Sequence, residues 1–340
     1  KVQKLVDVAA KVVDLAGDVS AAKLTQAELT LIGITGVNSA TKLALVNDLL
    51  VADSTAQAAL SDIQTFANVA AKVITNLELA TSATFDDTNA LTAAELVTLG
   101  MTQDTGTPRT LVSSGAATDS VNAENLGLIR LAIANAGSNA DDSAVNRLSK
   151  ITTLVTTTAT AANKVANYAD AATTPTDAGL IPTVADFEAI LVTGIDSTNL
   201  SSVLDALAQS GVPVSSAIQT NVQSVVDSYN VILAAADGID NDPTLPGESD
   251  FTRLGVTLSS HSNVAVKTAQ VNVLADIVDL KTSVEVDTVA ELQALAGNVE
   301  ALLSTAALAD GTDISAQGVS VAELQALGFS GATNENIAAI

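Results

Sequence analysis

The stretch "LTAAELVTLG" at residues 91–100 returns in altered form four more times along the chain. The related stretches are "LTQAELTLIG" from Leu24, "PTVADFEAIL" from Pro182, "PGESDFTRLG" from Pro246 and "VSVAELQALG" from Val319. Self-similarity of this kind is the signature of a repeat architecture. The recurrence therefore decides the fold prediction, because each copy marks the same place in a structural unit.

Each copy predicts a short capped helix. A hydroxyl residue followed three positions later by an acid forms a capping box, in which both side chains satisfy backbone N–H groups. The pairs are Thr25 and Glu28, Thr92 and Glu95, Thr183 and Asp186, and Ser320 and Glu323, with Gly247 and Asp250 in the fourth copy. A glycine then ends the helix, at Gly33, Gly100, Gly255 and Gly328. The third copy has Leu191 in that place, which predicts a different helix end.

Two more helices are predicted after each short one. Apolar residues recur at helical spacing in "TKLALVNDLL" from Thr41, "ENLGLIRLAI" from Glu124, "TNLSSVLDAL" from Thr198 and "SNVAVKTAQV" from Ser262. Longer apolar stripes follow, as in 60–77, 222–233 and 289–303. Residues 152–164 are rich in Thr and Val, which favour strands. They occupy the place of a long helix, so we predict a helix there.

The predicted fold is all-α: tandem three-helix units (short, medium, long) of about 65 residues, stacked as an elongated array. Discrete bundles joined by flexible links are the alternative. The predicted divisions are 1–23 (the long helix of a preceding repeat), 24–90, 91–181 with an inserted loop at about 102–119, 182–245, 246–318, and 319–340 (the start of a further repeat). The incomplete pattern at both ends, with no initial Met or signal peptide, leads us to expect a segment of a longer or processed protein.

Composition excludes several classes of partner and site. The chain has 38 acidic and 14 basic residues and a net charge of −24, which argues against nucleic-acid binding and against an anionic membrane surface. No apolar run is long enough for a membrane span. The absence of cysteine excludes disulfides, thiolate metal sites and thiol catalysis. An acidic surface suits a protein exposed outside the cell.

No catalytic or cofactor-binding residues are predicted. His261 is the single histidine, and no "GxSxG" elbow accompanies it, so a Ser–His–acid triad is not expected. Calcium is the one metal that the sequence leaves open, because an oxygen-rich loop contains Asp237, Asp240, Asp242 and Glu248. A second acidic loop holds Asp310 and Asp313. Neither loop has EF-hand spacing, and solvated turns are the alternative interpretation.

The pattern "TxxEφxxLGφTGφ", the "NL" that opens the next helix, and the stretches "VDSYNVILAAADG" and "VDTVAELQAL" resemble Ala/Val/Thr-rich tandem helical repeats. Such repeats occur in very large, adhesin-like bacterial cell-surface proteins. The resemblance covers nearly the whole chain. It implies a secreted or surface-attached structural region without enzyme activity. The insert in the second copy departs from the pattern.

We therefore expect a non-enzymatic stalk or spacer of a large extracellular adhesin, with neighbouring repeats or copies of itself as partners. One alternative is a self-assembling subunit of an extracellular fibre or surface layer. Another is a protein-binding helical module whose exposed helix faces contact a host or neighbouring-cell surface protein. The insert is a second place where such a contact could form, although a plain surface loop is the favoured interpretation of it. An enzyme is the least favoured reading, because the chemistry of an active site is missing.

Overall fold

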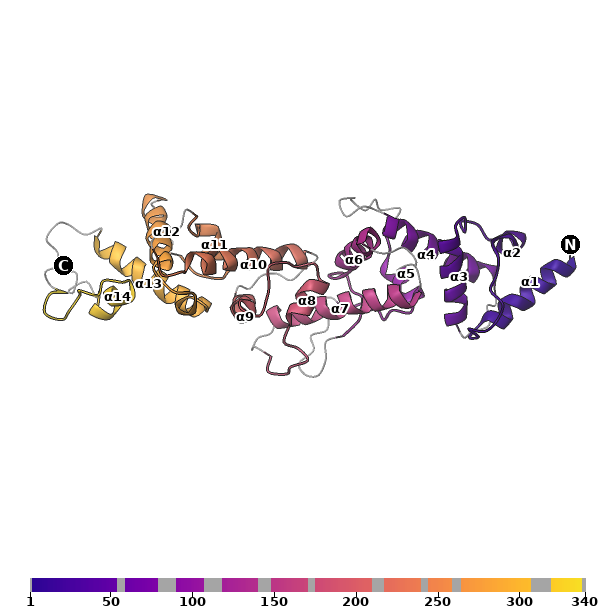
Figure 1. Ribbon diagram of the computed structural model, residues 1–340, viewed down its shortest axis with the longest axis horizontal. Helices are drawn as coiled ribbons and strands as arrows, with labels where there is room; N and C mark the ends of the chain where they lie inside the picture. Colours follow the sequence, from indigo (N-terminus) through magenta and orange to yellow (C-terminus); the bar gives the residue numbers. More distant parts are fainter. Residues whose placement is uncertain are drawn as a thin grey trace. The chain divides into compact units, whose positions relative to one another are not determined.

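The computed structural model describes residues 2–53, 59–78, 90–106, 118–139, 148–170, 175–209, 217–239, 244–258, 264–306 and 319–337. These residues form fourteen α-helices and one 3-10 helix, and the described ranges contain no β-strand, only two isolated bridges (Figure 1). The prediction of an all-α chain is therefore confirmed. None of the described helices is long and apolar enough to cross a membrane.

The chain divides into two compact units. The first contains α1 (Val2–Leu15), α2 (Gln26–Leu31), α3 (Ala40–Ala52), α4 (Leu60–Glu78), α5 (Ala93–Thr98), α6 (Leu126–Asn139) and most of α7 (Leu148–Asp170). The second contains nearly all of α8 (Val184–Ala189), α9 (Leu200–Gln209), α10 (Ile218–Ala235), α11 (Glu248–Arg253), α12 (Val264–Asp279), η1 (Ser283–Glu285), α13 (Val289–Ala306) and α14 (Val321–Ala326). The Thr-rich segment 152–164 lies within α7, so its helix prediction is confirmed.

The predicted capping boxes begin the short helices. At α2 the Thr25 hydroxyl accepts from the Glu28 N–H at 3.2 Å, and the Glu28 carboxylate accepts from the Thr25 N–H at 2.7 Å. The same reciprocal bonds open α5, α8 and α14. At α11, Asp250 accepts from the N–H of Gly247, which has no hydroxyl to offer. These bonds satisfy N–H groups that a helix start leaves free.

The short helices end on a left-handed residue. Gly33, Gly100, Gly255 and Gly328 have φ values of 88°, 91°, 92° and 96°. Leu191, for which a different helix end was expected, has φ 60° and takes the same place. The Val192 N–H also donates to the Phe187 carbonyl at 3.0 Å, as Ile34 does to Leu29. The prediction was wrong because the Schellman bond imposes its geometry even on a leucine, at the cost of backbone strain.

The core of the first unit is built from aliphatic side chains. α4 contacts both α3 and α6, and α1 contacts α3. Leu29 and Leu96, the equivalent leucines of two short helices, are 1% and 0% exposed. Because these leucines lie in the same apolar cluster as residues of α1, α3, α4, α6 and α7, the short helices are fixed to the core by burial.

The core of the second unit includes aromatic side chains. Phe187, Tyr229 and Phe251 are fully buried. The Tyr229 hydroxyl donates to the Val286 carbonyl at 3.0 Å, which satisfies the one polar group of that side chain. α13 packs against α9, α12 and α14.

Candidate functional site

A glutamine at the start of a long helix binds the turn that follows the short helix. The Gln64 Oε1 accepts from the Thr35 N–H at 3.0 Å, and the Gln64 Nε2 donates to the Thr35 carbonyl at 3.2 Å. The same two bonds, at 2.7–3.1 Å, join Gln223 to Thr193 and Gln293 to Thr257. We call this pair of bonds the glutamine clamp. Sequence analysis missed the clamp, although an alignment of the long helices on Gln64, Gln223 and Gln293 would have revealed it.

An asparagine at the start of the medium helix closes the same turn. The Asn199 Oδ1 accepts from the Asp196 N–H at 2.9 Å, and its Nδ2 donates to the Gly194 carbonyl at 2.7 Å. Asn125 and Asn336 make the equivalent bonds, to residues three and five positions earlier. The asparagine of the predicted "NL" pair is thus the residue that orients the medium helix.

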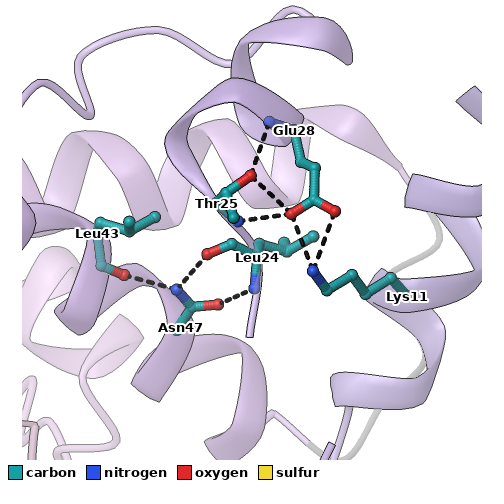
Figure 2. Close-up of polar contacts among 6 residues, drawn as sticks. All are labelled: Lys11, Leu24, Thr25, Glu28, Leu43 and Asn47. Atoms are coloured by element: carbon teal, nitrogen blue, oxygen red, sulfur yellow. Dashed lines mark hydrogen bonds and ion pairs between the residues drawn. The ribbon is translucent and has the colours of Figure 1, made fainter. Parts of the chain in front are cut away.

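The capping carboxylate also links the short helix to a long one. Lys11 on α1 donates to both Glu28 oxygens, at 3.0 and 2.9 Å (Figure 2). The bond from Lys11, together with those from Thr25, lowers the pKa of Glu28 to about 2. In the second copy Lys72 on α4 pairs with Glu95 at 2.7 Å. There burial acts to raise the pKa of Glu95, but the bonds from Lys72 and the cap outweigh it and leave that pKa lowered.

A buried asparagine fixes the entry to the first short helix. The Asn47 Oδ1 accepts from the Leu24 N–H at 2.9 Å, and its Nδ2 donates to the carbonyls of Leu24 and Leu43 at 3.0 Å (Figure 2). Asn47 is only 4% exposed. In the second copy Arg130 donates to the Leu91 carbonyl at 2.6 Å. Asn47 and Arg130 both bind the backbone just before a short helix. Because they are different residue types, the repeated sequence pattern does not predict either contact.

The insert of the second copy has a polar base built around Asn163 on α7. Its Nδ2 donates to the carbonyls of Thr118 and Ser120, at 2.9 and 3.0 Å, and its Oδ1 accepts from the Nδ2 atoms of Asn122 and Asn125, at 2.9 and 3.2 Å. Asn163, Asn122 and Asn125 are all less than 5% exposed. A fully bonded buried network of this kind fixes one conformation.

The second copy joins its turn to the insert. The Thr102 carbonyl accepts from the Val121 N–H at 2.8 Å, and the Val121 carbonyl accepts from the Asp104 N–H at 2.9 Å. In the first, third and fourth copies the glutamine clamp holds the equivalent threonine, which is Thr35, Thr193 or Thr257. Val121, at the C-terminal end of the insert, thus binds the turn in place of a glutamine. Residues 107–117, at the middle of the insert, lie outside the described residues.

The calcium candidates are only partly described. Asp237 accepts the N–H two residues later at 2.8 Å, which is an Asx turn, and Glu248 pairs with Lys267. Asp240 and Asp242 lie outside the described residues. Within the described ranges, no group of three or more His, Cys, Asp or Glu side chains could hold a metal ion. Calcium binding stays a prediction.

Three further residues weighed in the sequence analysis lie outside the described residues, namely His261, Asp310 and Asp313.

The first unit contains a cavity of about 440 Å³. Its polar lining residues, among those that the structure describes, are Asp53, Asp62, Thr65 and Thr98. Comparison with protein-family models, curated proteins and solved structures found no match for this chain.

Proposed function

We propose that the chain is a tandem array of three-helix units that serves as a non-enzymatic spacer in an extracellular bacterial surface protein. The observation that carries this proposal is the glutamine clamp, which recurs with the same atoms at Gln64, Gln223 and Gln293. Because the same contact between a long helix and a turn occurs three times, it supports a structural unit that repeats along the chain. The extracellular location rests on the resemblance and on the acidic composition.

Contacts between neighbouring units support a mechanical role. α4, the long helix of the first proposed unit, packs against α3 of the same unit and α6 of the next. The Asp48 carboxylate on α3 accepts from the N–H of Leu148, the first residue of α7, at 3.3 Å. In the second compact unit, Asp205 on α9 accepts from the N–H of Val289, the first residue of α13, at 2.7 Å. Units that share helices and caps in this way carry load from one to the next.

The array is tested by adding units to the intact chain. One or two further copies of residues 182–245 would be inserted in frame after residue 245. The maximum dimension in solution, measured by X-ray scattering, is expected to grow by an equal increment for each copy, with unchanged helix content per residue. A dimension that does not grow, or a loss of helix content, would refute the tandem array, because the added copies would then not extend it as folded units.

A second candidate function is protein binding by the insert, and the Asn163 network favours it. The Asn163 network fixes the returning end of the insert, and the backbone bonds of Thr102 and Asp104 to Val121 fix its start. Fixed ends reduce the entropy that a loop loses when it binds a partner. Deleting residues 107–117 while keeping the anchored base tests this function. Loss of cell-surface adhesion with unchanged helix content would support a binding role, and full adhesion by the deletion variant would refute it.

A further inference from the structure

Two carboxylates bind the backbone at the start of α13. The Asp205 Oδ2 accepts from the Val289 N–H at 2.7 Å, and the Glu291 Oε2 accepts from the Thr288 N–H at 3.1 Å. Asp205 comes from α9, whereas Glu291 lies in the first turn of α13 itself. A helix start favours negative charge, because its N–H groups are free and its dipole is positive there. Both carboxylates are therefore well placed as anions.

Asp287, directly before Thr288, adds a third carboxylate to this helix start. Its side chain is hydrogen-bonded to Glu291. Ionised carboxylates are acceptors only, so a bond between two of them requires a proton on one. Burial raises the pKa of Asp287, and the charge of Glu291, the bond to Glu291 and the charge of Asp205 raise it further. The three carboxylates therefore take up a shared proton more readily than separate carboxylates do.

The buried Tyr229 of α10 lies beside all three carboxylates. Its hydroxyl donates to the carbonyl of Val286, the residue before Asp287, at 3.0 Å. Burial raises the pKa of Tyr229, and the charges of the three carboxylates raise it further. The pKa of Tyr168 on α7 is likewise raised, by burial and then by the charge of Asp205. Both phenols therefore stay neutral in acid and offer the carboxylates no positive charge.

No basic side chain among the described residues contributes to the raised pKa of Asp287 or opposes it. Lys281, shortly before it in the chain, pairs with Glu285 at 3.5 Å. On α12, which also packs against α13, Lys267 pairs with Glu248. The other acidic groups on helices packed against α13 also leave that pKa unaffected, namely Asp276 and Asp279 on α12 and Glu323 on α14. At neutral pH the start of α13 therefore brings negative charges together without a described basic partner.

The matching contact in the first unit differs in charge. There the Asp48 carboxylate of α3 accepts from the N–H of Leu148, the first residue of α7, at 3.3 Å, as Asp205 does at the first residue of α13. Asn146 stands two positions before the start of α7, where Asp287 stands before the start of α13. The sequence thus has a neutral residue at the first contact and a carboxylate at the second. The first contact is an internal reference for the effect of that carboxylate.

We propose that the contact between α9 and α13 responds to acid. At neutral pH the ionised Asp205, Asp287 and Glu291 repel one another, and this repulsion favours opening of the first turn of α13. As the pH falls, one proton is shared by Asp287 and Glu291, the repulsion is relieved, and α9 and α13 are held together more firmly. The contact joins the third and fourth proposed repeats, so its role as an acid-sensitive joint rests on the proposed tandem array.

Amide hydrogen exchange of the full chain tests the acid response, because it measures local opening. After correction for the chemical exchange rate, protection of the Thr288 and Val289 amides is expected to rise severalfold from about pH 7 to about pH 4, the range in which a carboxyl with a raised pKa gains its proton. Asp287→Asn carries no charge at this position, so its protection should be high throughout. Asp276→Asn removes an exposed carboxylate of α12, and this control should respond to pH as the wild type does.

The Leu148 amide is the reference within the same molecule, and its protection should not rise as the pH falls. Wild-type protection at Val289 that stays level or falls, or an Asp287→Asn variant that responds as the wild type does, would overturn the inference. Loss of the response in Asp276→Asn would also overturn it, because the total charge of the unit would then be responsible. Regular growth in length with added units, found without an acid response, would refute this inference and leave the proposed array intact.

Discussion

Gly137 of α6 approaches Leu77 of α4 so closely that a Cβ on Gly137 would lie 1.8 Å from the Leu77 carbonyl oxygen. The atom in the way is backbone, which has no rotamer by which to move aside. Gly137→Ala should therefore separate α6 from α4 and lower the free energy of unfolding by about 1–3 kcal/mol, the usual cost of overpacking. Urea denaturation followed by circular dichroism measures the change.

Gly127 provides the matched control, because it lies in the same helix and a Cβ there would meet no atom within 4 Å. Gly127→Ala should stabilise the protein by up to about 1 kcal/mol, through the lower entropy of the unfolded chain and the higher helix propensity of alanine. A Gly137→Ala variant that is stabilised to the same extent would contradict the close approach of the two helices.

The left-handed end of α5 gives a second prediction. Gly100 has φ 91° and open space around the position of a Cβ, so Gly100→Ala changes backbone strain alone. We expect it to lower stability by about 1 kcal/mol. Gly100→Asn should cost less, because asparagine tolerates left-handed backbone. Equal stability of Gly100→Ala and wild type in thermal unfolding would rule out the left-handed turn.

The glutamine clamp predicts a graded loss of stability. Gln64→Ala removes both bonds to Thr35 and should cost about 1–2 kcal/mol, at the usual net value for hydrogen bonds in proteins. Gln64→Glu keeps the acceptor but loses the donor, so its stability should fall between those of wild type and Gln64→Ala. Thr65→Ala, an exposed neighbour on α4, is the control and should have little effect. Urea midpoints that do not follow this order would contradict the clamp.

The Glu28 carboxylate predicts a pH dependence. Its pKa is lowered to about 2 in the folded chain, from a usual value of 4.5, chiefly by Lys11 and then by the cap. A lowered folded-state pKa contributes stability above the unfolded pKa, and that stability is lost as the pH falls from 4.5 toward 2. The variant Glu28→Gln has no charge to titrate at this position. As the pH falls from 4.5 toward 2, its stability relative to wild type should therefore rise.

Unfolding midpoints of the wild type and of Glu28→Gln, measured from pH 6 to pH 2, test the prediction. Lys11→Met should remove much of the same difference, because Lys11 is the largest cause of the lowered pKa. A difference between wild type and Glu28→Gln that stays constant across this range would mean that the carboxylate does not titrate as described.

The Asn163 network predicts that the insert loosens when its anchor is lost. Asn163→Asp has nearly the same shape but loses the Nδ2 donor that binds the carbonyls of Thr118 and Ser120. Unsatisfied buried carbonyls cost about 1–3 kcal/mol each. Limited proteolysis with mass spectrometry should show faster cleavage between residues 102 and 121. Unchanged cleavage would indicate that Asn163 does not anchor the insert.

Local sequence signals predicted the parts of the fold that depend on neighbouring residues. The Thr25 and Glu28 cap, and the glycine at position 100, act within two helical turns, so their residue types suffice to identify them. Leu191 shows the limit of such signals. Its side chain disfavours the left-handed conformation, yet the backbone bond from Val192 to Phe187 determines how that helix ends.

The sequence by itself determined an all-α chain, the starts of its short helices, and a start-of-unit pattern that recurs five times, because these features follow from hydrogen bonds between residues close in the chain. Only the tertiary structure decided that Gln64 binds Thr35, that Lys11 shares the capping carboxylate of Glu28, and that Asn163 anchors the insert. Those bonds join residues 17 to 45 positions apart. Their formation depends on how packed helices bring polar atoms to hydrogen-bonding distance, and residue types alone do not specify that distance.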